Sequence, residues 1–388
     1  MGFFIENAEA LITFDNSNMR VLRKTNIAIE DGHLKCIGKD CVKSRDMEVI
    51  DGSHKLVMPS LINSFVDPLS IINKPRCYVN NEFSLNELLT RFTCLKHVLN
   101  GLAGFISLNR NILEYDICRD LKIHIAYLDK QGSIESTFVE GKTVLSFPYI
   151  DLNSDEDLDN LKSTRKTNNW IFIRTPLTRR RFFDIKRITG KWVIELLNDY
   201  NLISEKTVLI GLNWVSATDI NYILMNKPVI LTSPSQSMNL GEYSYLPVKP
   251  LLKGKVPLVL FSSDYSLLGF NLYLEYPIFY LLTKFLYDGL NNGYSFVIQS
   301  TITTPYSILG LNINYLIEGS KPTLVIFNIG YRGDWFANLD LNPLLFLETT
   351  VEYLFIDGEP VLTPSVRSIY VSELKSIMNE LFLRGCLD

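Results

Sequence analysis

The chain has 388 residues, of which 47% are hydrophobic and 21% are charged, and its formal net charge at pH 7 is -4. This composition is typical of a well-packed globule and excludes a disordered or nucleic-acid-coating chain. The acidic balance gives no electrostatic reason to expect DNA, RNA or an anionic membrane as a partner. The length suits one large domain or two.

The first part of the chain, up to residue 54, alternates short apolar runs with turn signals. Asp31-Gly32 lies between two apolar runs and is typical of a β-hairpin, and Asp51-Gly52 marks another turn. This pattern predicts a small β unit.

From residue 55 onward the rhythm changes to apolar strands that are separated by helical patterns. Ser84 is the expected N-cap of the first long helix, because Glu87 follows three residues later. Near-continuous apolar strands that alternate with helices predict a parallel sheet, and eight such units predict a closed barrel. The candidate strands are KLVMPSLIN (55–63), AGFISLN (103–109), IHIAYLD (123–129), KTVLSFPYI (142–150), NNWIFIRTP (168–176), KTVLIGLNW (206–214), KPVILTSP (227–234) and VPLVLFSSD (256–264).

The last part of the chain, residues 349–365, returns to a hairpin pattern with Asp357-Gly358 at its centre. We therefore expect an α/β protein with a TIM-like (β/α)8 barrel over residues 56–335. A small β-sandwich domain is expected to be built from both chain ends, residues 1–55 and 336–388.

Six cysteines, at positions 36, 41, 77, 94, 118 and 386, occur without any Cys-x-x-Cys pair. We expect free, mostly buried thiols in a reducing compartment. The first five residues are too short for a signal peptide. The apolar region 256–286 is interrupted by charged residues, which indicates buried core rather than a membrane span. These features predict a cytoplasmic protein with no membrane partner.

Several segments resemble the amidohydrolase superfamily, nearest its deaminase and chlorohydrolase branch, and they occur in the order found in that family. They are EVIDGSHKLVMPSLIN (48–63), LTSPSQSMNLG (231–241), LVLFSSD (258–264) and TITTPYSILGLNINYLIEGSKPTLVIFN (301–328). The resemblance runs nearly end to end and implies the same barrel with a flanking β domain. It also implies hydrolysis of non-peptide C–N bonds at a metal centre.

The residues at the family's metal-ligand positions differ from the family pattern. The resemblance places the two first-strand histidines on Phe65 and Asp67, and the fifth-strand histidine on Arg174. The glutamate three residues further on falls on Leu177. The two histidines that follow the sixth strand fall on Gly211 and Trp214, and the eighth-strand aspartate is retained as Asp264.

The family chemistry needs a metal that lowers the pKa of a bound water from about 15.7 towards about 7. A catalytic zinc usually has three protein ligands. Phe65 cannot ligate a metal, and Arg174 carries a permanent positive charge where a cation would bind. Asp264 and Asp67 remain as candidate catalytic residues, while a structural role is open for both. We expect no cofactor, and zinc only if an active hydrolase uses a rearranged site.

A basic run follows the fifth strand, at the barrel end where ligands bind in this fold. Clustered arginines suit phosphate or carboxylate recognition, although short charge runs are commonly solvated loops. The candidate ligand-binding residues are Arg174, Arg179, Arg180 and Arg181.

The favoured hypothesis is an amidohydrolase-like protein without the usual metal-dependent catalysis, with a binding or structural role. The alternatives are an active hydrolase of C–N bonds with a rearranged site and an anion-binding module. A small molecule, an anion or a protein is left open as partner, and the family implies a homodimer. A barrel end filled by Phe65, Trp214 and other large side chains would favour the first hypothesis.

Overall fold

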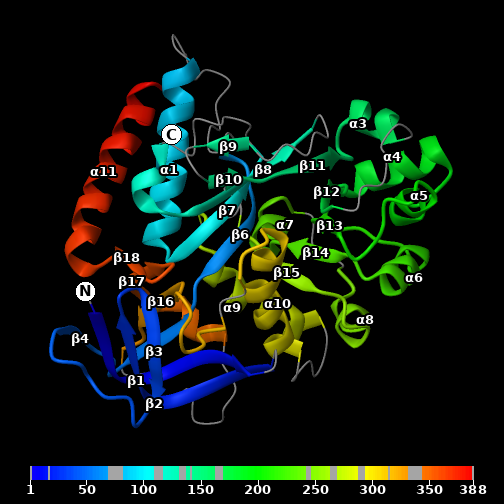
Figure 1. The fold of residues 1–388 in the computed structure, drawn as a ribbon. Helices are drawn as coiled ribbons and strands as arrows, with labels where there is room; N and C mark the ends of the chain where they lie inside the picture. The colour runs from blue at the N-terminus through cyan, green and yellow to red at the C-terminus, as the bar shows by residue number, and fades with distance from the viewer. Residues whose placement is uncertain are drawn as a thin grey trace.

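The computed structural model describes residues 2–15, 18–68, 82–108, 117–130, 137–139, 142–161, 169–241, 246–262, 269–286, 293–312, 315–330 and 343–386. Two eight-stranded sheets organise this part of the chain. Figure 1 shows the first as the blue and orange strands near the N-terminus, and the second as the strands from blue to yellow-green that the helices surround.

The first sheet combines strands from both ends of the chain. Its hydrogen-bonded order is β18-β17-β16-β5-β1-β2-β3, and β4 pairs in parallel with β1. The strands are β1 (Gly2–Asp15), β2 (Asn18–Glu30), β3 (His33–Gly38), β4 (Met47–Asp51), β5 (Lys55–Pro59), β16 (Leu324–Asn328), β17 (Thr350–Ile356) and β18 (Glu359–Leu362). Because β5 and β16 belong to this sheet, its strand membership differs from the division expected at residues 56 and 335.

The two predicted hairpin turns of this sheet lie against each other. Asp31 and Gly32 both have positive φ, as do Asp357 and Gly358, and two-residue hairpin turns of this kind require that backbone conformation. A Cβ on Gly358 would lie 1.8 Å from the carbonyl oxygen of Gly32, so only glycine fits where the turns meet.

The second sheet is a nearly closed parallel barrel, which confirms the predicted fold class. Its order is β15-β14-β13-β12-β11-β8-β7-β6. The strands are β6 (Leu61–Val66), β7 (Leu102–Ser107), β8 (His124–Asp129), β11 (Ser146–Asp151), β12 (Ile171–Arg174), β13 (Thr207–Ile210), β14 (Val229–Thr232) and β15 (Leu258–Leu260). All eight candidate strands are present, and the first divides into β5 and β6. A separate pair, β9 (Thr137–Val139) and β10 (Lys142–Val144), forms a small antiparallel ribbon.

Helices cover the outside of the barrel (Figure 1). They are α1 (Glu82–Leu99), α3 (Asp155–Asn160), α4 (Arg179–Thr189), α5 (Val193–Asp199), α6 (Ala217–Asn226), α7 (Pro234–Asn239), α8 (Val248–Lys253), α9 (Glu275–Leu286), α10 (Gly293–Ile308) and α11 (Pro364–Leu383). Short 3₁₀ segments are η2 (Arg119–Leu121), η4 (Leu272–Leu274) and η6 (Pro343–Leu347). The C-terminal helix α11 packs against α1.

Side-chain caps fix where several of these helices begin. Ser154, Thr178 and Ser216 each accept a hydrogen bond from the backbone N–H three residues further on. The predicted cap at Ser84 is wrong, because α1 already begins at Glu82 and Ser84 lies within its first turn. Helix boundaries are weakly encoded locally, and the packing of the apolar face of the helix decides them.

Disulfides correct the prediction of free thiols. Cys36 is bonded to Cys41, Cys94 of α1 is bonded to Cys118, and Cys386 is also disulfide-bonded. Spacing did not reveal the second pair, because its cysteines lie 24 residues apart in sequence. Disulfides are typical of oxidising compartments and of intracellular proteins from hyperthermophiles, so the predicted cytoplasmic location stays a prediction. In the described chain, no helix has both the length and the hydropathy needed to cross a bilayer.

Candidate functional site at the C-terminal end of the barrel

The interior of the barrel is filled by large apolar side chains. Strand side chains alternate between the two faces, so each strand sends part of its apolar residues inward and part outward under the helices. The inner cluster includes Phe65, Leu128, Tyr149, Phe172, Ile210, Leu231 and Phe261. Among the described residues, the interior of the barrel is therefore a packed apolar core.

Phe65 is the central aromatic residue of this cluster and is only 1% exposed. Its ring stacks at 6.2 Å from the ring of Tyr149 and meets Phe261 edge-on at 5.6 Å. These distances are those of favourable aromatic pairs. The position at which the resemblance places a metal-binding histidine therefore holds a packed phenyl ring without any donor atom.

Arg174 ends β12, and its side chain is 12% exposed. The guanidinium carbon lies 5.4 Å from the centroid of the Phe65 ring, and Nη1 lies 3.6 Å from Oδ2 of Asp151. Among the described residues, no acceptor lies within hydrogen-bond distance of its buried Nε–H. Burial alone lowers the pKa of Arg174, but Tyr149, Asp151 and Asp67 outweigh burial and raise it, so the group stays charged.

Tyr149 and Asp151 form the polar wall next to this guanidinium. The Tyr149 hydroxyl donates to Oδ2 of Asp151 at 3.3 Å. Burial raises the pKa of Tyr149, and the charge of Asp151 raises it further, so the phenol is neutral. Oδ1 of Asp151 accepts from the backbone and side-chain amides of Asn153 at 3.0 and 2.8 Å. The carboxylate is thereby held in one orientation.

The two candidate acidic residues differ in what the structure describes. Asp67 directly follows β6, is half-buried, and contributes to the electrostatic environment of Arg174. Asp264 lies outside the described residues. The expectation that these two residues act together as acid and base stays a prediction.

The remaining family positions also carry no metal-binding group. Gly211 follows β13 with φ of +93°, and a Cβ there would lie 3.5 Å from both Leu177 Cδ2 and Thr175 Oγ1. Trp214 is half-buried and stacks under the guanidinium of Arg179, 5.7 Å from the ring centroid. In the described chain, no three histidine, cysteine, aspartate or glutamate residues form a group able to hold a metal ion. These residues do not fit the metal that the family implies.

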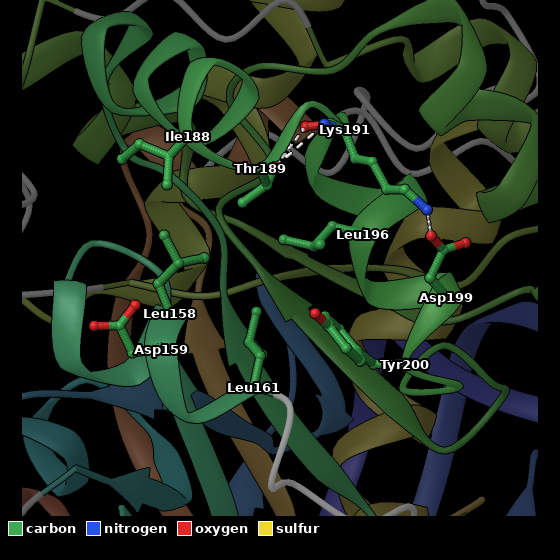
Figure 2. Close-up of a pocket in the computed structure, with 9 residues that line it drawn as sticks. All are labelled: Leu158, Asp159, Leu161, Ile188, Thr189, Lys191, Leu196, Asp199 and Tyr200. Carbon is green, nitrogen blue, oxygen red and sulfur yellow. Dashed lines mark hydrogen bonds and ion pairs between the residues drawn. The ribbon is translucent and has the colours of Figure 1, made fainter.

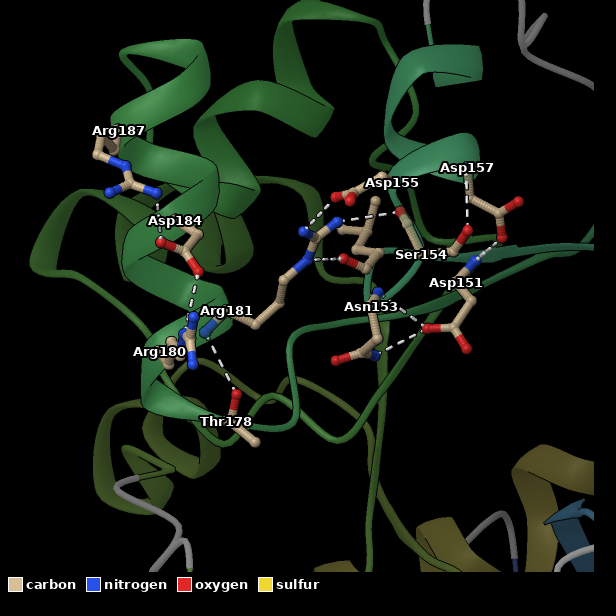
Figure 3. A network of polar contacts seen from close by, with 11 residues as sticks. Asp151, Asn153, Ser154, Asp155, Asp157, Thr178, Arg180, Arg181, Asp184 and Arg187 are labelled. Atoms are coloured by element: carbon tan, nitrogen blue, oxygen red, sulfur yellow. Dashed lines mark hydrogen bonds and ion pairs between the residues drawn. The ribbon is translucent and has the colours of Figure 1, made fainter. Parts of the chain in front are cut away.

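The arginines of the basic run have separate surroundings and do not converge on one site. Arg181 donates hydrogen bonds to Leu152 O at 2.7 Å, to Ser154 O at 3.0 Å and to Asp155 Oδ1 at 2.6 Å. These bonds connect α4 to the start of α3 and to the loop before it (Figure 3). Arg180 is 93% exposed on the outer face of α4, where it pairs with Asp184 at 3.8 Å. Arg179 stacks on Phe183 and Trp214.

Sequence reasoning missed a buried carboxyl group at the start of α9. Glu275 accepts from the Ser233 hydroxyl at 3.0 Å, from the Ser235 backbone N–H at 3.1 Å and from the Ser235 hydroxyl. Burial raises the pKa of Glu275 to about 7, although the serine hydrogen bonds oppose this shift. Both serines lie in the segment 231–241 that carries part of the resemblance, but their partner lies 40 or more residues away and gives no local signal.

A second buried polar group, also missed, lies on the outer side of β6. Nδ2 of Asn63 donates to Nε2 of His97 at 3.2 Å, and Nδ1–H of His97 donates to Thr93 O at 2.7 Å. Because a carbonyl only accepts, the proton of the neutral imidazole is on Nδ1. Burial lowers the pKa of His97 to about 4, against the opposing effect of the Thr93 bond.

Cavities occur away from these groups. One of about 440 Å³ lies between α3, α4 and α5, with Leu158, Leu161 and Leu196 among its lining and the Lys191–Asp199 ion pair on one wall (Figure 2). Another of about 380 Å³ lies beside the starts of β3, β8 and β16 and includes His33 and His124. Neither of these cavities is lined by a predicted site residue.

Comparisons with known proteins agree with this architecture. No protein-family model matches the chain. The 5-methylthioadenosine/S-adenosylhomocysteine deaminase of Pyrococcus furiosus is 23% identical over an alignment of 397 positions, gaps included, which covers 87% of this chain and 91% of that protein. An adenosine deaminase from Xanthomonas campestris with bound zinc superposes with a TM-score of 0.75 at 12% identity, over 98% of each chain. These similarities support the resemblance to the amidohydrolase superfamily that the sequence indicated.

Two further solved structures have the same fold. An atrazine chlorohydrolase from Arthrobacter aurescens, complexed with zinc, has a TM-score of 0.70 at 14% identity, over 97% of this chain and 99% of that one. The guanine deaminase of E. coli has a TM-score of 0.69 at 14% identity, over 94% and 99%. The superfamily resemblance predicted from the sequence is thus confirmed.

Proposed function

We propose that this amidohydrolase-superfamily protein has no metal-dependent catalysis and acts through binding, or as a structural subunit. The observation that carries the proposal is the contact between Phe65 and Arg174 in the barrel interior. Both residues stand where the resemblance places metal-binding histidines. An aromatic ring and a permanent cation, packed 5.4 Å apart, leave neither a donor atom nor a suitable charge for a metal ion.

The proposal is tested by the metal content of protein purified without chelator, with the midpoint of thermal unfolding measured with and without added zinc. We expect substoichiometric metal and an unchanged midpoint, because a ligand that binds only the folded state would raise it. Near-stoichiometric zinc, or clear stabilisation by zinc, would overturn the proposal.

The alternative is an active hydrolase of C–N bonds in which Asp67 and Asp264 act as acid, base or weak metal ligands. It is tested by release of ammonia from aminated purines, purine nucleosides and amino-triazines. Turnover that is lost in both Asp67→Asn and Asp264→Asn would establish the alternative. The absence of turnover, together with the absence of metal, would leave the binding role.

The partner of the barrel is proposed to be a small molecule, an anion or a protein, with the homodimer of the family as the oligomeric state. The described contacts of the arginines weigh against an anion site built from the whole basic run, since Arg181 is fully engaged within the chain. Sedimentation equilibrium decides between a monomer and a dimer.

A further inference from the structure

The guanidinium of Arg174 lies among groups that need a positive charge. The carboxylate of Asp151 lies 3.6 Å from Nη1, and Asp67 and Tyr149 also act electrostatically on Arg174. Asp151 is 15% exposed and Arg174 is 12% exposed, so water screens their charges only weakly. Without a cation, the carboxylates of Asp151 and Asp67 would have no opposite charge at the end of a packed apolar barrel.

The same guanidinium is held by stacking rather than by a complete set of hydrogen bonds. It lies over the Phe65 ring, and aromatic faces attract cations. Its Nε–H is buried without an acceptor among the described residues, although such a donor usually costs stability. The charge of Asp151, the contact with the Phe65 ring and a hydrogen bond with Tyr149 therefore account for the burial of this side chain.

We propose that the guanidinium of Arg174 supplies, at this end of the barrel, the positive charge that a metal ion supplies in the superfamily. The ring of Phe65 supports this guanidinium. Two replaced ligand positions thus act as one unit: the ring at position 65 supports the guanidinium from position 174. This inference rests on the proposed function in one respect, since it requires that no metal ion occupies the same place.

The test removes the guanidinium group by substitution of Arg174 and then adds guanidinium ions to the solution. In Arg174→Ala we expect the midpoint of thermal unfolding to fall by about 5 °C or more, because a buried carboxylate loses its counter-ion. Millimolar guanidinium chloride, far below denaturing concentrations, is expected to recover part of this loss, whereas equal sodium chloride is not. The wild-type protein and Arg180→Ala, whose arginine is 93% exposed, are expected to show neither the loss nor the recovery.

Two further variants keep the test decisive if Arg174→Ala does not fold. Arg174→Lys retains the positive charge, and Arg174→Met retains much of the side-chain volume without the charge. We therefore expect the Arg174→Lys variant to be the more stable of the two. A Met variant as stable as the wild type, or an Ala variant that guanidinium does not recover, would overturn the inference. Stoichiometric metal in the wild-type protein would overturn the proposed function instead, and these two failures are read from different measurements.

Discussion

The side-chain amide of Asn63 is hydrogen-bonded in both directions to the backbone of Ser262. Nδ2 donates to the Ser262 carbonyl at 2.7 Å, and Oδ1 accepts from the Ser262 N–H at 3.1 Å. The hydrogen-bonded order of the barrel ends at β6 on one side and at β15 on the other. Asn63 lies in β6, and Ser262 lies two residues after the end of β15. The asparagine side chain thus closes the barrel where the strand ladder ends.

Replacing Asn63 with Asp tests this closure. The carboxylate cannot donate to Ser262 O or His97 Nε2, and it places a charge in a fully buried site. We expect the free energy of unfolding to fall by about 3 kcal/mol or more, measured by urea unfolding. The matched control, Asn312→Asp on the surface, is expected to change it by less than about 0.5 kcal/mol. Equal effects of the two substitutions would contradict the role of Asn63.

Two buried groups give the stability of the protein opposite dependences on pH. His97 has a folded pKa of about 4, below its ordinary 6.5, so the unfolded chain binds more protons between these values. Stability from His97 is complete above pH 6.5 and is lost as the pH falls towards 4. Glu275 has a folded pKa of about 7, above its ordinary 4.5, so its contribution is lost as the pH rises from 4.5 to 7.

Each group contributes roughly 3 kcal/mol at most, since one pKa unit is worth about 1.4 kcal/mol. The two slopes oppose one another between pH 4.5 and 6.5, so we expect a shallow profile for the wild type in that range. In Glu275→Gln, the free energy of unfolding is expected to rise with pH over this range, because only His97 then titrates. In His97→Gln, it is expected to fall, because only Glu275 then titrates. Urea unfolding across this range measures both, and parallel profiles in the two variants would contradict the assignment.

Arg181 and Arg180 are neighbours on α4 with different expected contributions. Arg181 is 15% exposed and donates to two carbonyl oxygens of the loop before α3 and to Asp155, the first residue of α3, whereas Arg180 is 93% exposed. We expect Arg181→Ala to lower the free energy of unfolding by about 2 kcal/mol and Arg180→Ala by less than about 0.5 kcal/mol. Chemical denaturation of the two variants measures these losses of stability. A larger loss in Arg180→Ala than in Arg181→Ala would indicate that Arg181 serves ligand binding instead.

The disulfide that closes the longer loop is expected to stabilise the protein more, with a logarithmic dependence on loop length. Cys94–Cys118 spans 24 residues and Cys36–Cys41 spans 5. In the chain-entropy model, replacing the first pair with alanines costs about 3.5 kcal/mol and replacing the second about 2 kcal/mol. Unfolding of the two double variants without reductant measures the difference, with thiol titration of the unfolded wild type as the control for oxidation. Free thiols at these four positions would refute this prediction.

Local sequence patterns predicted the elements of this fold well. The eight barrel strands are short apolar runs, and the turns at Asp31-Gly32 and Asp357-Gly358 use residues suited to positive φ. These signals lie within a few neighbouring residues, so a single sequence contains them. The resemblance placed two of the family's ligand positions on Phe65 and Arg174, and the structure brings these two side chains into contact.

The partners of polar groups were not predictable in the same way. Asn63 bonds to a residue 199 positions away, and Glu275 bonds to serines 40 and 42 positions away. The arginine run looks uniform in sequence, yet its members lie in different places because a helix turns each side chain by roughly 100° relative to the preceding one. Pairing over such distances follows from the tertiary fold alone.

The placement of β5 between β1 and β16 has a consequence for synthesis of the chain. Pro59 pairs with Leu324, so 265 residues (324 minus 59) separate the two strands in the order of translation. At about 5 to 20 residues per second, β5 remains the open edge of an unfinished sheet for roughly 13 to 50 s. All eight barrel strands are synthesised during that interval. The sheet that contains the first strands to leave the ribosome is therefore completed only after the barrel strands have been made.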